Sequence, residues 1–139
     1  MAEALGVAAS IIAILQVIQT ITTYVKELKG ADEERNNIFK EATSLYHFLD
    51  ALNTKVPDQV QPGDIWFKTL KSFKTPDGPL EQIKLLLDRL TAKLKSAKAF
   101  KKFGQALFWP FQKGEVKEIL DSIEHQKSII GLALENDHM

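Results

Sequence analysis

The residues of this sequence whose types could carry out acid–base or metal chemistry are its three histidines and the carboxylates near them. His47 lies three residues before Asp50, and Asp121 lies four residues before His125, so on a helix each pair shares one face. Such pairs are usually surface hydrogen bonds, and His138 stands apart from both. The sequence has no cysteine and no G-x-S-x-G, H-E-x-x-H or P-loop motif. We therefore expect no enzymatic activity, no metal site and no cofactor.

A cluster of cations interleaved with aromatic residues lies in the second half of the chain. The charged residues between Asp88 and Glu115 are all basic, namely Arg89, Lys93, Lys95, Lys98, Lys101, Lys102 and Lys113. Phe100, Phe103, Phe108, Trp109 and Phe111 lie among them. Near an anionic membrane each lysine contributes about 1 kcal/mol, and aromatic rings prefer the membrane interface.

Two other interpretations of this cluster stay open. The aromatic residues can cover one end of a helical core while the lysines keep a helix end in water. Single-stranded nucleic acid also suits basic residues beside aromatic rings. However, 18 basic and 18 acidic residues give no net charge, so we expect no nucleic-acid partner.

A charge-free run opens the chain: the 22 residues from Ala4 to Val25 carry no charge. At about 1.5 Å per residue a helix of this length reaches roughly 33 Å, enough for a hydrocarbon core of about 30 Å. Its apolar residues recur at intervals of three and four, which lines one helix face, while glutamines and threonines gather on the other. These polar side chains would need partners in lipid, which an oligomer could provide. We predict that the segment is a packed core helix at rest.

The spacing of apolar residues predicts helices at about 4–29, 32–55, 64–74, 79–104 and 114–136. We expect Gly30 to end the first helix, Asp32 to cap the second, and Pro79 to begin the fourth after a cap at Asp77 or Gly78. No segment shows sustained strand alternation, and 139 residues suffice for one domain. The predicted fold is all-α: a single domain, 1–139, forming an antiparallel four-helix bundle with an additional short helix.

The chain resembles the HeLo-like N-terminal domains of fungal STAND and NLR-like receptors, which are related to HeLo and mixed-lineage kinase-like four-helix-bundle cell-death domains. Three stretches carry the resemblance. They are the start "MAEALGVAASIIAILQVIQTITTYVKELKGADEER", the segment "LTAKLKSAKAFKKFGQALFWPFQKGEVKEIL" with its Trp-Pro-Phe, and the ending "IEHQKSIIGLALEND". Together with their spacing they cover nearly the whole chain.

The resemblance implies a cytoplasmic domain that self-associates on activation, moves to the plasma membrane and causes programmed cell death in immunity or heterokaryon incompatibility. The implied partners are anionic lipids and an NLR-like receptor module in cis or in trans. The membrane-active helix maps to Leu5, Gly6, Val7, Ile11, Ile12, Ile14, Leu15, Ile18, Ile21 and Val25. The lipid-contacting lysines map to Lys93, Lys95, Lys98, Lys101 and Lys102, with Phe108, Trp109 and Phe111 as interfacial aromatics.

A homotypic adaptor is the alternative function. Such a domain would assemble receptors without touching lipid, and its polar-faced first helix and exposed aromatic residues would make protein contacts. Reversing the charge of Lys95, Lys98 and Lys102 should then leave signalling intact.

Overall fold

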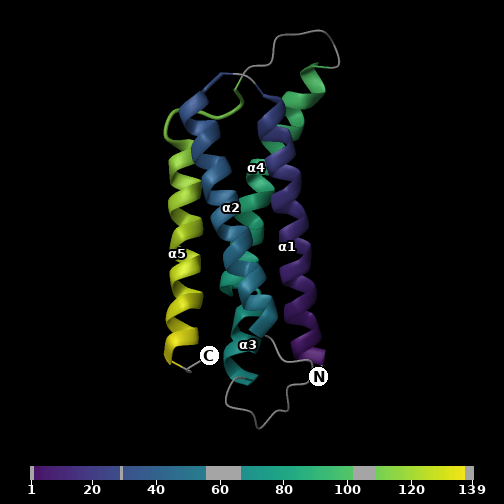
Figure 1. Cartoon of the computed structure of the whole chain (residues 1–139), viewed down its shortest axis with the longest axis vertical. Coiled ribbons are helices and arrows are strands. Elements are labelled where there is room, and N and C mark those ends of the chain that lie inside the picture. The colour runs from purple at the N-terminus through teal and green to yellow at the C-terminus, as the bar shows by residue number, and fades with distance from the viewer. Residues whose placement is uncertain (1, 29, 56–66, 102–108, 137–139) are drawn as a thin grey trace.

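Helices make up nearly all of the computed structural model (Figure 1), which describes residues 2–28, 30–55, 67–101 and 109–136. They are α1 (Ala2–Glu27), α2 (Asp32–Lys55), α3 (Phe67–Lys74), α4 (Pro79–Lys101) and α5 (Glu115–Asn136). No strand occurs within these ranges. The prediction of an all-α chain is confirmed.

The five predicted helices match the observed ones, with small shifts at their ends. α1 begins at Ala2 and ends at Glu27, so it lies about two residues earlier than the spacing predicted. α3 begins at Phe67, and the residues from 64 to 66 that were expected to precede it lie outside the described ranges. The same is true of residues 102–104 at the end of α4.

The turn between α1 and α2 uses a left-handed backbone, as the glycine predicted. Gly30 has a φ of 85°, and Ala31 follows with a φ of 48°. The prediction that Asp32 caps α2 is wrong, because the Ala31 carbonyl accepts the first helical bond, from the Arg35 amide at 2.9 Å. The Asp32 carboxylate instead accepts a hydrogen bond from the Arg35 guanidinium at 2.7 Å.

α4 begins at Pro79, as predicted, because Gly78 caps it. The Gly78 carbonyl accepts a hydrogen bond from the Gln82 amide at 3.1 Å. A Cβ at position 78 would lie 2.5 Å from the Ser72 carbonyl oxygen, so only glycine fits here. This close approach joins the end of α3 to the start of α4.

One hydrophobic core lies between the helices. Each long helix contributes the stripe that its sequence spacing predicted, for example Ile11 and Ile18 from α1, Leu45 from α2, Leu87 from α4 and Ile123 from α5. α1 packs against α2, α3 and α4, while α5 packs against α2, α3 and α4. Within the described residues no polar or charged residue is fully buried.

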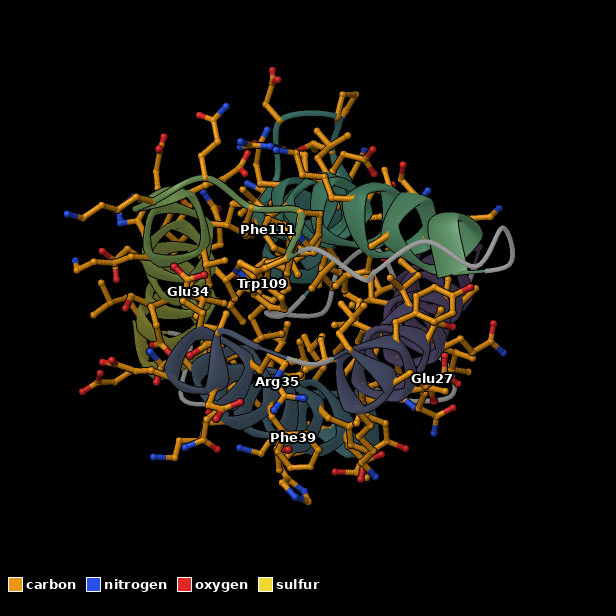
Figure 2. All side chains as sticks on the ribbon, turned by 90° about the horizontal axis from the view of Figure 1, so that it is seen from above. Glu27, Glu34, Arg35, Phe39, Trp109 and Phe111 are labelled. Carbon is orange, nitrogen blue, oxygen red and sulfur yellow. The ribbon has the colours of Figure 1, made fainter. Side chains whose placement is uncertain are left out.

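Different segments form the two ends of the molecule. Both termini and α3 lie at the lower end in Figure 1. The upper end holds the α1–α2 turn and the segment that leads into α5. Figure 2 looks onto this upper end, where Trp109 and Phe111 lie over the middle of the helices.

Candidate membrane-contact surfaces

The predicted membrane-active face of α1 lies in the core. Val7, Ile11, Ile14, Leu15, Ile18, Ile21 and Val25 are all buried. Gly6 is half-buried, Ile12 is 47% exposed, and the Leu5 side chain lies outside the described residues. Burial of an apolar face removes it from water, which stabilises the packed state. In this conformation α1 is a core helix, as predicted for the resting state.

α1 also has the length and composition of a membrane-spanning helix. Gly6–Glu27 is 22 residues long, its mean hydropathy is 1.7, and it is the one such helix within the described ranges. In an 18-residue window of this stretch 28% of the residues are buried, so α1 has one face in the core and one face toward solvent.

The threonines on the outer face of α1 already have hydrogen-bond partners within the helix. Thr20, Thr22 and Thr23 donate to the carbonyl oxygens four residues earlier, at 3.2, 2.9 and 3.0 Å. These hydroxyls carry their bonds with them wherever α1 goes. The threonine hydroxyls are thus bonded within the helix, whereas the amides of Gln16 and Gln19 are exposed.

Only part of the predicted basic cluster can be placed. The Lys93 ammonium donates to both oxygens of Glu115, at 2.6 and 2.7 Å. Lys95 is exposed on α4. The side chains of Lys98 and Lys101, and the whole of Lys102 and Phe108, lie outside what the structure describes. Lys93 is therefore paired with a carboxylate at rest, while Lys95 faces solvent.

The aromatic residues that are described cover the upper end of the core. The rings of Trp109 and Phe111 lie 5.1 Å apart, and Phe111 is 7% exposed. Trp109 is half-buried, and its indole N–H donates to the Glu34 carboxylate (Figure 2). Lys93 also lies over the Phe111 ring, 5.8 Å from its centre. In this conformation the two rings face protein, as the structural interpretation of the cluster predicted.

An arginine that the sequence patterns did not single out joins the end of α1 to α2. One N–H group of the Arg35 guanidinium donates a hydrogen bond to the Leu28 carbonyl, just past the end of α1. Another donates to the Asp32 carboxylate. Figure 2 shows Arg35 near the middle of the upper end. Carbonyls at a helix end lack partners within the helix, so a guanidinium there is a natural cap. No sequence motif predicts this contact, because it depends on the path of the α1–α2 turn.

A charged cluster occupies the boundary between α2 and α5. Lys127 donates to Glu124 at 2.9 Å and to Ser44 at 3.0 Å, and lies 3.8 Å from Glu41. The pKa of Glu41 is raised to about 7, mainly by burial and also by the nearby Glu124 carboxylate, while Lys127 partly offsets the rise. A groove of about 780 Å³ runs along the same boundary, between the first half of α2 and the start of α5.

The histidines do not form a site. His47 and His125 are exposed, and His138 lies outside the described ranges. Asp121 forms an ion pair with Lys117 at 2.8 Å, whereas the sequence spacing suggested a pair with His125. No group of three His, Asp or Glu side chains that could hold a metal occurs among the described residues.

Comparison of the chain with models of protein families, with curated proteins and with solved structures gives no match. Its function is therefore inferred from the chain's own residues.

Proposed function

We propose that this protein is a HeLo-like, membrane-targeting domain that causes cell death when it oligomerises, with α1 as its membrane-active element. In this proposal the four long helices form a four-helix bundle in which consecutive long helices run antiparallel, with α3 as the additional short helix. The domain is cytoplasmic at rest. An NLR-like receptor module, in cis or in trans, drives its assembly at the plasma membrane.

The two faces of α1 carry the proposal. The inward face is hydrocarbon, and the outward face has no charge between Gly6 and Val25. Because the threonine hydroxyls bond within the helix, the exposed amides of Gln16 and Gln19 are the groups of this face that would gain most from partners in lipid. Neighbouring copies of α1 in an assembly would supply those partners. A purely structural core helix has no need of an uncharged outer face.

A homotypic adaptor is the second candidate, and one feature of α5 favours it. Ile129 is 39% exposed and Leu132 is 61% exposed, and they lie three residues apart on the same helix face. Exposed apolar residues in this number are ordinary on a soluble protein, but their adjacency is also typical of a small protein contact.

A charge placed at the middle of the outer face of α1 tests the membrane proposal. Gln16→Glu is nearly isosteric, and Gln16 is exposed, so the fold should tolerate it. In a membrane a central carboxylate costs about 3 kcal/mol, or roughly a hundredfold in the insertion equilibrium. We expect a forced oligomer of the natural chain to release dye from anionic liposomes, and the variant to release far less.

Asn36→Asp is the matched control, since it makes the same amide-to-carboxylate change at an exposed position of α2. It should release dye like the natural chain. Equal release by the Gln16→Glu oligomer would rule out α1 as the membrane segment. Full signalling in cells by an oligomer that releases no dye would favour the adaptor.

A further inference from the structure

The groups proposed to touch the membrane at the upper end are held by two carboxylates from different helices. Glu115, the first residue of α5, binds Lys93 of α4. Glu34, in the first turn of α2, binds the indole of Trp109. Each carboxylate therefore occupies the polar atom that a lipid would otherwise contact. A role for these two contacts in lipid recognition rests on the proposed membrane function.

Glu115 makes the contact that a phosphate would make with Lys93. Both of its oxygens lie within 2.7 Å of the ammonium nitrogen. The hydrogen bond from Lys93 lowers the pKa of Glu115, so the carboxylate is ionised at neutral pH. Glu115 also accepts from the Gln112 amide at 3.1 Å, which fixes the turn directly after Phe111. Losing Glu115 would free both the cation and the turn.

Glu34 holds the aromatic half of the same segment. Trp109 needs a partner for its N–H while its ring is packed, and Glu34 provides one from α2. At a membrane interface, water and lipid carbonyls would serve the N–H while the ring enters the headgroup region. At such an interface the Glu34 bond can be replaced while the ring stays out of water.

We propose that Glu34 and Glu115 form an acidic latch, which keeps Trp109 and Lys93 on the protein until an anionic phospholipid surface replaces the two carboxylates, with a phosphate at Lys93 and a lipid carbonyl or water at Trp109. Arg35, the neighbour of Glu34, caps the end of α1. Half of the latch and the contact that caps α1 therefore lie on neighbouring residues of one turn of α2. The surface that recognises the membrane and the helix that enters it are linked through this turn.

Two double variants with the same charge change test the latch. The latch variant is Glu34→Ala with Glu115→Ala, and the control is Glu33→Ala with Glu118→Ala. Glu33 and Glu118 lie in the first turns of the same two helices and are exposed, so the control matches the effects on helix dipole and net charge. Binding is measured by co-sedimentation with phosphatidylserine–phosphatidylcholine vesicles and with phosphatidylcholine alone.

We expect the latch variant to bind the anionic vesicles about tenfold more tightly than the control, which corresponds to about 1.4 kcal/mol. Neither variant should bind phosphatidylcholine alone. Equal binding of the two variants to anionic vesicles would overturn the latch, because the gain would then come from net charge.

A second readout without lipid separates the latch from the function. In a Trp66→Phe background Trp109 is the only tryptophan. Acrylamide should quench its fluorescence more strongly in the latch variant than in the control, and unchanged quenching would overturn the latch. If quenching rises but no chain, including the forced oligomer, binds vesicles, the membrane function itself fails and the latch loses its lipid role. Equal release of Trp109 by inorganic phosphate would overturn the assignment to a lipid surface.

Discussion

The two sides of α2 share one hydrocarbon core but differ in the charged groups beside it. Toward α1, the buried residues of both helices are hydrocarbon, such as Ile18 and Leu45. Toward α5, the boundary contains Glu41, Glu124 and Lys127 beside a groove of about 780 Å³. Hydrocarbon contact is insensitive to pH and changes little when lipid replaces protein, whereas a charged cluster responds to pH and cannot move into lipid. In the proposed function, α1 is the helix that enters lipid while α2 and α5 stay together, and this difference in chemistry supports that assignment.

The largest expected effect comes from shortening a buried side chain of α1. Ile18→Ala should lower the free energy of unfolding by about 3 kcal/mol, because it removes three methyl or methylene groups from a packed site and leaves a cavity. Urea denaturation followed by circular dichroism measures this. Ile12→Ala on the same helix is the control, and since Ile12 is 47% exposed its cost should stay under about 1 kcal/mol. Similar losses for the two would show that α1 is not packed through one face.

This asymmetry of α1 was predictable from sequence. Spacing alone identified the buried stripe from Val7 to Val25, because a helix repeats every 3.6 residues or so and the core accepts only one face. Spacing also placed the five helices. The capping of α2 was harder to predict, because the Asp32 carboxylate bonds to the Arg35 guanidinium in the folded turn and the first helical bond goes to the Ala31 carbonyl.

The α2–α5 boundary should respond to loss of its cation. Lys127 is 12% exposed, and Lys127→Met keeps its stem while leaving Glu41 and Glu124 without a positive partner. We expect a loss of about 2 kcal/mol in the free energy of unfolding, because a largely buried carboxylate loses its compensation. Lys117→Met breaks the exposed pair with Asp121 and should leave the free energy of unfolding nearly unchanged. Equal losses in the free energy of unfolding for the two variants would mean that the α2–α5 boundary is solvated throughout.

The charged boundary and the latch were beyond the reach of sequence. The partners of Lys127, Glu41 and Ser44, lie more than 80 residues away in the chain. The bond between Trp109 and Glu34 spans 75 residues. Helical periodicity reports which face is buried, but it carries no information about which residues of two helices meet. The basic–aromatic cluster was recognisable, whereas its carboxylate partners were not.

The smallest expected effect is a pH dependence of the free energy of unfolding, which should come from the α5 side of α2 and not from the α1 side. Burial raises the pKa of Glu41 to about 7, from the usual value of 4.5 that applies in the unfolded chain. Between these values the folded chain holds a proton that the unfolded chain has lost. The associated stability is complete below the unfolded pKa and disappears as the pH rises through the folded pKa.

From about pH 6 to about pH 8 this proton should account for a fall of about 1 kcal/mol in the free energy of unfolding. The pKa of Glu124 is lowered, so its contribution is lost only at acid pH and stays constant across this range.

Glu41→Gln removes the titration, and the difference between the two chains cancels the other titrating groups. Urea denaturation at each pH should show a smaller slope in the variant, and parallel pH profiles would contradict the protonation of Glu41. Ile18→Ala should keep the natural pH slope, since the α1 boundary contains no titrating group in its buried face. A chain that loses stability with rising pH while α1 stays packed would thus locate the pH response between α2 and α5.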